Sequence, residues 1–377
     1  MARFVRKVTR NIFIAAHIVT VLIFAAACCT SFLHPSKYWF IAILGIGFPF
    51  LVAALVFFLF FWWFFKSKWA FLSLAAIILG WFQISVLFAF HPFASKSDKK
   101  EEGSLRVMQW NISRLDQMNK TRPGGSFRSQ ILETVRKHDA DVLCFQEFLE
   151  SNNARELEEN IPYFVNELKY PYHYFARDHR RWDGVYEHGV IIFSRFPILD
   201  TLRLRYSGPD SLKASESLIH TDIDFRGQRV RIFTTHMQSL LFGGEDYYKL
   251  KSIATAEDSA VEKSKSIIKK FRRAYGLRSS QAELVRRELD SSPYPEILCG
   301  DFNDVPNSFC YFKVKGDRQD AFLREGFGLG RSFASLSPTL RIDYIFADKK
   351  FEVLQCRKFK LPYSDHYPIV ADFLLSK

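Results

Sequence analysis

The pattern of hydrophobic and polar positions divides the chain near residue 95. Three stretches before this point carry no formal charge, namely 11–36, 38–65 and 69–95. Each is long enough to cross the hydrocarbon core of a membrane, for which a helix needs about 20 residues. We therefore predict a membrane domain, residues 1–94, rather than a buried bundle of soluble helices. Its three transmembrane helices are expected near 12–33, 39–64 and 69–90.

Basic residues indicate the orientation of these helices. Four precede the first predicted span and two lie between the second and third, whereas Lys37 is the only one between the first and second. Basic residues favour the cytoplasmic side, so we predict a cytoplasmic N-terminus and an extracytoplasmic position for the chain beyond residue 95. Lys96, Lys99 and Lys100 favour the reverse. "FAAACC" resembles a lipoprotein cleavage site at Cys28, but two more spans follow, and we interpret it as part of an uncleaved helix.

Net charge follows the same division. The formal net charge is +12, and residues 1–100 hold ten Lys or Arg and one acidic residue. Residues 101–377 therefore carry only +3, which is a weak electrostatic case for a nucleic-acid-binding surface. The six cysteines follow no metal-binding spacing and imply no disulfide framework.

Beyond a polar linker, residues 95–103, the pattern is that of a second domain, residues 104–377. Short apolar runs typical of strands recur along it, at 106–112, 141–148, 189–196, 218–225, 229–237, 296–302, 341–347, 351–359 and 367–375. Helical spacing of apolar residues occurs between some of them, at 127–138, 151–168 and 278–290. Because helices separate only some of the strands, we predict an α+β domain with two mostly antiparallel sheets packed together and helices outside.

Polar residues that can carry chemistry stand at the ends of several of these strands. They are Asn111, Glu147, His236, Asp301, Asn303, Asp343, Asp365 and His366. Taken singly, such residues are commonly structural, as turn formers or satisfied core histidines. Strand ends gather on one rim of a sandwich, however, so the set can converge on a pocket suited to metal-assisted hydrolysis. We interpret Gly300 as the residue that lets the backbone turn at this point.

Six short motifs occur in a fixed order in the second domain: "QWN", "FQE", "TTHMQS", "GDFND", "RIDYIF" and "SDHYPI". They resemble the endonuclease/exonuclease/phosphatase superfamily, whose members include deoxyribonucleases, apurinic endonucleases, neutral sphingomyelinases and inositol-polyphosphate 5-phosphatases. The resemblance covers residues 104–377. It implies a four-layer αββα sandwich and an enzyme that cleaves phosphoesters by in-line attack of water, without a covalent intermediate.

The resemblance also implies a metal site. Glu147 matches the family's principal metal-binding carboxylate and Asn111 the amide beside it, while Asp365 is a candidate second ligand. The implied cofactor is Mg²⁺, with Mn²⁺ as an alternative, because a hard cation that keeps bound waters suits a site with few protein ligands.

The remaining residues match catalytic positions of the family. Asp301 matches the residue that orients or deprotonates the attacking water, and Asn303 the amide that helps to hold it. His366 matches the imidazole that contacts the scissile phosphate, with Asp343 orienting it. His236 matches a histidine of deoxyribonuclease-like and sphingomyelinase-like members that protonates the leaving oxygen.

Departures from family patterns narrow the substrate. His236 stands where apurinic endonucleases have a tyrosine, and "RIDYIF" lacks the Trp-Cys-Asp-Arg run of inositol 5-phosphatases. The predicted partners are therefore a lipid bilayer and a phosphodiester, with a lipid headgroup favoured over nucleic acid because of the membrane domain. The alternatives are a membrane-tethered nuclease that acts on extracytoplasmic DNA or RNA, and a catalytically inactive membrane scaffold.

A basic segment, residues 263–278, lies between the strands that carry His236 and Asp301. It holds seven Lys or Arg and no acidic residue, and its apolar residues follow helical spacing. It is either a surface helix with a solvated basic face or a basic amphipathic helix that binds the anionic surface of the membrane. Binding of nucleic acid is the third alternative.

Overall fold

The structure is a computed structural model, and it describes residues 1–92, 99–119, 122–206, 216–241, 245–246, 260–335 and 337–376. The chain forms two compact units. The first comprises Met1–Phe88, Glu245–Ser279 and Val305–Lys313, and the second Ala89–Gly244, Ser280–Asp304 and Val314–Lys377. The predicted linker lies partly outside the described residues, and the domain boundaries stay predictions.

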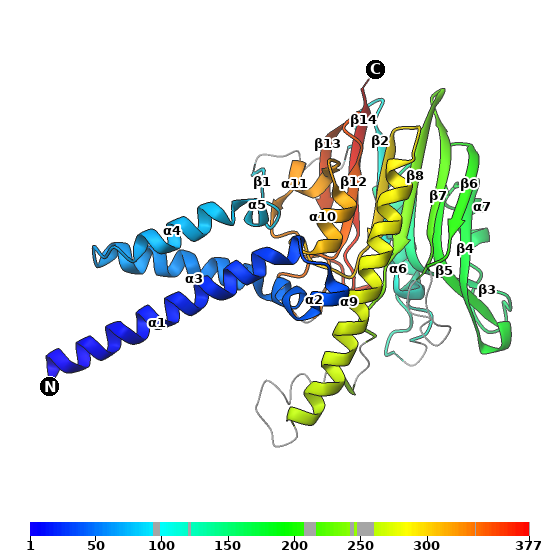
Figure 1. Cartoon of the computed structure of the whole chain (residues 1–377). Helices are drawn as coiled ribbons and strands as arrows, with labels where there is room; N and C mark the ends of the chain where they lie inside the picture. The colour runs from blue at the N-terminus through cyan, green and yellow to red at the C-terminus, as the bar shows by residue number, and fades with distance from the viewer. Residues whose placement is uncertain are drawn as a thin grey trace. The chain divides into compact units, whose positions relative to one another are not determined.

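The first unit is built around apolar helices (Figure 1). They are α1 (Ala2–Cys28), α2 (Pro35–Ala42), α3 (Leu44–Phe64), α4 (Ala70–Leu79) and α5 (Trp81–Ile84), with a 3-10 turn η1 (Cys29–Ser31). The rings of Phe13 and Phe61 stack with centroids 4.8 Å apart, and those of Phe24 and Phe48 at 5.3 Å. The start of α1 therefore lies beside the end of α3, and the two helices are antiparallel.

Two helices, Arg3–Ser31 and Pro35–Phe64, are long and apolar enough to cross a membrane. The third predicted span, 69–90, is wrong in length, because α4 has only 10 residues and ends at Leu79, just before Gly80. A Cβ on Gly80 would lie 2.4 Å from the ring of Phe24. Close packing on α1 therefore requires glycine there, and the backbone leaves the helical conformation at this residue (ψ 8°).

The second unit contains two six-stranded sheets (Figure 1). One sheet has the order β10 (Gln319–Asp320), β12 (Asp343–Ala347), β9 (Glu296–Asp301), β8 (Gln228–His236), β7 (Leu218–Phe225) and β6 (Ile198–Leu204). The other has the order β13 (Phe351–Lys358), β14 (Ile369–Leu375), β2 (Leu105–Asn111), β3 (Val142–Ser151), β5 (Tyr186–Ser194) and β4 (Tyr172–Arg181). A short pair joins β1 (Ala89–Phe90) to β11 (Phe327–Gly328). Each predicted strand run overlaps one of these strands.

Further helices lie between the strands along the chain. The remaining helices are η2 (Ser113–Asp116), α6 (Arg128–His138), α7 (Ile161–Asn166), η3 (Trp182–Gly184), α9 (Ala260–Asp290), α10 (Phe309–Lys315) and α11 (Ala321–Glu325). The helix predicted at 151–168 is much shorter, because β3 continues to Ser151 and only α7 is helical.

The core lies between the sheets and under α6 and α7. Val107, Cys144 and Ile192 of one sheet meet Ile232 and Cys299 of the other in one buried cluster. A second cluster fills the space between β2, β3 and β5 and the helices α6 and α7. This α+β arrangement of packed sheets with outer helices is consistent with the sandwich that the resemblance implies.

Candidate active site

Strand pairing brings the predicted residues of the first sheet to one rim. β8 and β9 are parallel, with His236 opposite Asp301. β12 is antiparallel to β9, so its first residue, Asp343, also lies opposite Asp301. The carboxyl ends of parallel strands meet at the same edge of a sheet, and these three side chains therefore start from adjacent positions.

The second sheet delivers Asn111 and Glu147 in a similar way. β2 and β3 are parallel, and Asn111, the last residue of β2, pairs with Gln146. The pairing of β3 with β5 shifts between Phe145 and Phe148, and Glu147 takes a positive φ of 50°. Such a bulge re-aims a side chain out of its strand, which explains why Glu147 reaches the rim.

Asp301 is the centre of the site. Its Oδ2 accepts a hydrogen bond from Asn111 Nδ2 at 3.1 Å. The same oxygen lies 3.5 Å from His236 Nε2 and 3.6 Å from His366 Nε2. Its other oxygen accepts the backbone N–H of Asn303 at 2.9 Å, while Asn303 Nδ2 donates to the carbonyl of Met237 at 3.1 Å.

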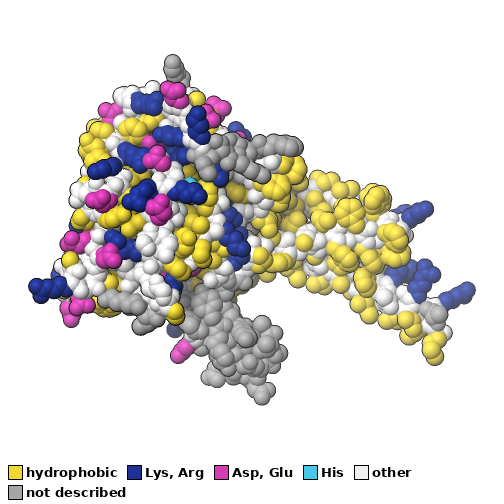
Figure 2. Space-filling view, turned by 180° about the vertical axis from the view of Figure 1, so that it is seen from behind, with side chains coloured by type: hydrophobic (Ala, Val, Ile, Leu, Met, Phe, Trp, Pro, Cys, Tyr) yellow, Lys and Arg dark blue, Asp and Glu magenta, His cyan; other side chains and the backbone are white. Residues whose placement is uncertain are grey.

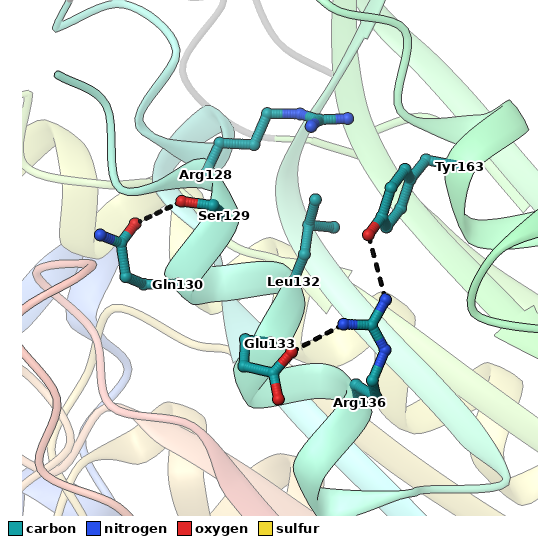
Figure 3. Close-up of a pocket in the computed structure, with 7 residues that line it drawn as sticks. All are labelled: Arg128, Ser129, Gln130, Leu132, Glu133, Arg136 and Tyr163. Atoms are coloured by element: carbon teal, nitrogen blue, oxygen red, sulfur yellow. Dashed lines mark hydrogen bonds and ion pairs between the residues drawn. The ribbon is translucent and has the colours of Figure 1, made fainter.

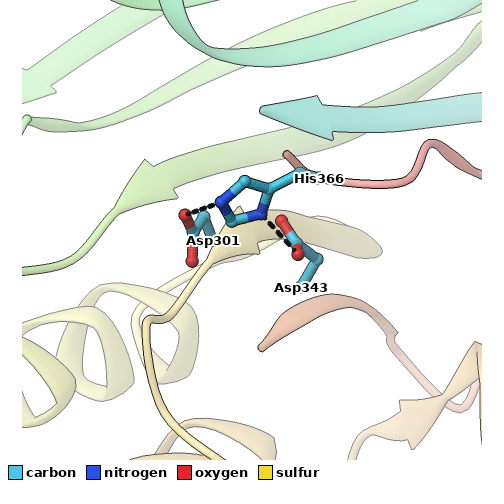
Figure 4. A group of neighbouring side chains, drawn as sticks. All are labelled: Asp301, Asp343 and His366. Carbon is cyan, nitrogen blue, oxygen red and sulfur yellow. Dashed lines mark hydrogen bonds and ion pairs between the residues drawn. The ribbon is translucent and has the colours of Figure 1, made fainter. Parts of the chain in front are cut away.

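His366 is fixed on its other side by Asp343 (Figure 4). The distance from His366 Nδ1 to Asp343 Oδ2 is 2.9 Å. Gln109 Nε2 donates to the second Asp343 oxygen at 3.2 Å, and the indole N–H of Trp110 donates to the His366 carbonyl at 2.9 Å. Both His366 and Asp343 are buried, so the imidazole has a defined position and orientation.

Glu216 belongs to this site and was not predicted. Its carboxylate lies 3.2 Å from His236 Nδ1 and 3.4 Å from His188 Nδ1, and it accepts the backbone N–H of Glu147 at 3.1 Å. Glu216 lies two residues before β7, which is antiparallel to β8. The start of β7 therefore lies on the same rim as the end of β8, and an acidic residue just before an apolar run was the available signal.

Gly300 has a different function from the predicted turn. It lies within β9, opposite Thr235 of β8. A Cβ at this position would lie 2.7 Å from the Thr235 carbonyl oxygen. Glycine is needed because the two parallel strands approach closely just before His236 and Asp301.

Burial and neighbouring charges shift the pKa values of these groups. Burial lowers the pKa of His236, but Glu216, Asp301 and Glu147 outweigh it and raise the pKa to about 9. Burial likewise lowers the pKa of His366, but Asp343 and Asp301 raise it well above its usual range.

The carboxyl groups respond to the same forces. Burial raises the pKa of Asp301, and the nearby Asp343 adds to this effect against the opposing imidazoles. Burial also raises the pKa of Glu216, but His236 and His188 outweigh it, so the pKa of Glu216 is lowered. Glu216 and His236 therefore form a buried ion pair at neutral pH.

The donor set fits a hard divalent cation, which favours oxygen ligands. Asp301, Asp343 and His366 each offer a ligand atom, and these atoms lie within 4.8 Å of one another. Asn111 Nδ2 lies 3.5 Å from Glu147 Oε1, which brings a third carboxylate to the same group. Asp365, in contrast, is exposed, and its carboxylate accepts from Ser364 Oγ at 3.4 Å.

A separate pocket of about 420 Å³ lies beside α6 (Figure 3) and is lined by Arg128, Ser129, Gln130, Leu132, Glu133, Arg136 and Tyr163. Its arginines are already engaged. Arg136 donates to Glu133 and to the Tyr163 hydroxyl, and Arg128 forms an ion pair with Glu158 at 2.5 Å. None of the predicted site residues lines it, so it does not belong to the candidate active site.

Solved structures of other proteins are similar to this chain. An endonuclease/exonuclease/phosphatase from Beutenbergia cavernae has a TM-score of 0.51 at 20% identity, over 73% of this chain and 72% of that one. The catalytic domain of human Nocturnin with bound sulfate gives 0.47 at 18% identity, over 74% and 97%. A mannosyl-6-phosphatase from Bacteroides thetaiotaomicron gives 0.44 at 19% identity, over 72% and 99%.

Two sequence profiles also match, whereas no curated protein sequence does. The profile of a domain of unknown function (DUF8431) matches residues 10–87. The profile of the endonuclease/exonuclease/phosphatase family matches residues 108–366, which is more than half of the chain. This protein therefore belongs to the endonuclease/exonuclease/phosphatase family, whose members hydrolyse phosphoesters.

Proposed function

We propose that this protein is a membrane-anchored, Mg²⁺-dependent phosphodiesterase that acts on a lipid headgroup or a similar phosphodiester. The observation that carries the proposal is the surroundings of Asp301. Two imidazoles approach its Oδ2, at 3.5 and 3.6 Å, and an amide donates to it at 3.1 Å. These groups meet around one point. The carboxylate can act as a base, a protonated imidazole as an acid, and the second imidazole and the amide as hydrogen-bond donors to a phosphoryl group.

Each residue has a distinct part in the proposed reaction. Asp301 accepts the proton of the attacking water, a role that its raised pKa favours. Asn303 helps to hold that water and the phosphate. His366, held protonated by Asp343, donates to a phosphoryl oxygen and offsets its charge. His236, with a pKa near 9, carries a proton at neutral pH and delivers it to the leaving oxygen.

Glu147 and Asn111 would hold the metal ion. Asp365, the other ligand predicted from the sequence, is exposed in the structure. The cation, when bound, offsets negative charge on the phosphoryl oxygens. Glu147 is suited to this position because 27% of its side chain remains exposed, so that it can reach a ligand outside the buried group.

The surface of the first unit supports the membrane anchor. Only 17% and 22% of the most apolar stretches of Arg3–Ser31 and Pro35–Phe64 are buried inside the protein. Figure 2 shows hydrophobic side chains along these helices and Lys and Arg at one end of them. An apolar surface of this extent, rimmed by cations, is what a helix pair in a bilayer requires.

The proposed orientation follows from helix packing within this unit. Because α1 and α3 are antiparallel, the basic residues in the first turns of α1 and those after α3, Lys66 and Lys68, lie at the same end, which we assign to the cytoplasm. α4 runs back beside α1, since Ser73 Oγ lies 2.7 Å from His17 Nε2 and Gly80 adjoins Phe24. The chain from α4 onward therefore runs in the direction of α1, and we propose that the catalytic domain lies on the extracytoplasmic side.

The basic segment gives a second reason to favour lipid. Within α9, Ile267 and Tyr275 are buried, whereas Lys269, Arg272 and Arg273 are exposed. This part of α9 belongs to the same compact unit as the apolar helices. We propose that its exposed cations bind anionic headgroups at the membrane surface, each contributing about 1 kcal/mol.

Full-length protein in detergent tests the function. It should be incubated with Mg²⁺ and a panel of plasmid DNA, RNA, sphingomyelin, phosphatidylinositol and bis-p-nitrophenyl phosphate, with Asp301→Asn protein and a chelator as controls. Hydrolysis of a lipid phosphodiester that both controls abolish is the expected result. Hydrolysis of DNA or RNA alone would replace the proposal by the nuclease alternative, and no turnover of any substrate would favour an inactive scaffold.

A further inference from the structure

A cluster of cations on the active-site rim has no part in the proposed chemistry. Lys358 is the last residue of β13 and pairs with Ile369, the first residue of β14. Ile369 lies three positions after His366 in the sequence. Lys360 follows it by two residues. Arg331 comes from a different segment of the chain. Its guanidinium donates to the carbonyl of Phe333 at 2.8 Å and to that of Ala334. We define the rim cluster as Arg331, Lys358 and Lys360.

The rim cluster adjoins the catalytic histidine through two aromatic side chains. The Phe333 ring lies 4.9 Å from the His366 imidazole, and the two residues form a β-bridge. Lys358 Nζ lies 5.7 Å from the centroid of the Tyr367 ring, and Tyr367 directly follows His366. An anion bound by the rim cluster would therefore lie near the active site, within reach of the same ligand.

The rim cluster is distinctive because it lacks acidic partners. Within the described ranges, neither Lys358 nor Lys360 forms an ion pair. Three arginines of this unit that are buried or partly buried are paired instead: Arg106 with Asp372 at 2.7 Å, Arg231 with Asp222 at 2.6 Å, and Arg318 with Glu296 at 2.9 Å.

The charges that act on Lys358 are all positive. Burial, together with Arg331, Lys360 and Arg341, lowers the pKa of Lys358 to about 8. Arg341 is itself neutralised by Asp320 at 2.6 Å, so the net repulsion comes from the rim cluster. It is unfavourable to hold like charges close together and partly out of water. An anion that binds between the cations would offset this electrostatic repulsion.

We propose that the rim cluster is a binding site for a second phosphate group of the substrate, one that is not cleaved. The ligand class is a phosphodiester that also carries a phosphate monoester, because a dianion matches several adjacent cations better than a singly charged diester does. This inference rests on the proposed function in one respect: the second phosphate belongs to the same ligand whose phosphodiester occupies the active site. The second phosphate can come from a nucleotide or from a lipid headgroup.

Equilibrium binding tests this proposal without requiring turnover. Full-length Asp301→Asn protein in detergent with Mg²⁺ would be titrated calorimetrically with thymidine 3′,5′-bisphosphate and with thymidine 5′-monophosphate. A second arm compares soluble short-chain phosphatidylinositol 4-phosphate with phosphatidylinositol. In at least one arm, the ligand with the additional phosphate should bind about tenfold more tightly, as expected for new charge-assisted hydrogen bonds.

Substitutions assign the preference to the rim cluster. Adding Lys358→Gln and Lys360→Gln should reduce the tenfold preference to less than about twofold. Adding Lys350→Gln, an exposed lysine near the opposite end of β13, should leave the preference intact. The arm that shows the preference identifies the source of the phosphate.

The outcomes separate this proposal from the proposed function. A preference that survives Lys358→Gln and Lys360→Gln, or no preference in either arm, overturns the rim site even if the enzyme hydrolyses lipids. A preference that disappears with these substitutions supports the rim site, even if wild-type protein cleaves none of the phosphodiesters in the activity panel.

Discussion

Replacing Glu216 by Gln should change the pH dependence of the enzyme more than its fold. Glu216 contacts His236 at 3.2 Å and His188 at 3.4 Å, and the amide of Gln occupies nearly the same volume. The substitution removes the negative charge that holds His236 protonated. We therefore expect His236 to lose its proton at a lower pH, and with it the ability to protonate a leaving group.

The magnitude follows from the pKa of His236. Burial lowers this pKa, and the carboxylates, Glu216 first, raise it to about 9 from an ordinary value of 6.5. Without Glu216, burial is opposed only by Asp301 and Glu147, so we expect a pKa of about 6.5 or below. At pH 8 the protonated fraction would fall from about 0.9 to about 0.03, which is roughly a 30-fold loss of the active acid.

The assay compares two kinds of leaving group. An alkoxide is a poor leaving group and needs a proton, whereas p-nitrophenolate leaves readily without one. We expect kcat/KM for an alkyl diester, thymidylyl-thymidine or glycerophosphocholine, to fall about 30-fold at pH 8 in Glu216→Gln. The basic limb of the pH profile of kcat/KM should move from near pH 9 in the wild type toward pH 6.5 in the variant. For bis-p-nitrophenyl phosphate the loss at pH 8 should be much smaller.

A matched control is Glu167→Gln, which removes an exposed carboxylate of the same unit. It should leave both profiles unchanged. If the basic limb stays in place in Glu216→Gln, or if both substrates lose activity equally at every pH, then His236 is not the acid that Glu216 controls.

Three further results are expected. Glu147→Gln and Asp301→Asn should each lower phosphodiester hydrolysis by at least about 10²-fold while the protein remains folded, and near-normal turnover at saturating Mg²⁺ would contradict the site assignment. A C-terminal alkaline phosphatase fusion should be active and a C-terminal green fluorescent protein fusion dark, and the reverse would place the catalytic domain in the cytoplasm. Replacing Lys269, Arg272 and Arg273 by Gln should weaken co-sedimentation with anionic liposomes but not hydrolysis of bis-p-nitrophenyl phosphate, and unchanged co-sedimentation would exclude the docking role of α9.

Several of the predicted residues lie close together in the structure because one geometric rule holds well in this fold. Polar residues after parallel strands meet at one edge, and β8 with β9 brings His236 and Asp301 together in this way. Glu216 does not follow a strand, so a rule about the residues at strand ends does not select it. The start of an antiparallel strand, such as β7, nevertheless reaches the same rim. Gly300 was misinterpreted because a close approach between strands cannot be seen in one strand alone.

The missed elements have a common physical cause. No predicted strand run covers β4 or β6. Each of them lies at one edge of its sheet, and most of their side chains are exposed or only partly buried. An edge strand with little buried surface shows no strict alternation of apolar and polar residues, so the period-two signal is weak. The third predicted span failed for a related reason, because hydropathy does not register the helix break at Gly80, where the chain packs closely on Phe24.

Glu216 also links the proposed metal ligand to the proposed acid. One carboxylate accepts the backbone N–H of Glu147 at 3.1 Å and contacts His236 at 3.2 Å. Glu147 has a positive φ of 50°, which is unfavourable for a residue with a side chain and must be stabilised by its surroundings. If that hydrogen bond supplies the stabilisation, Glu216→Ala should raise the Mg²⁺ concentration needed for half-maximal activity, whereas Glu216→Gln, which retains an oxygen acceptor, should shift mainly the pH limb. If neither variant alters the Mg²⁺ requirement, the bulge in β3 alone positions Glu147.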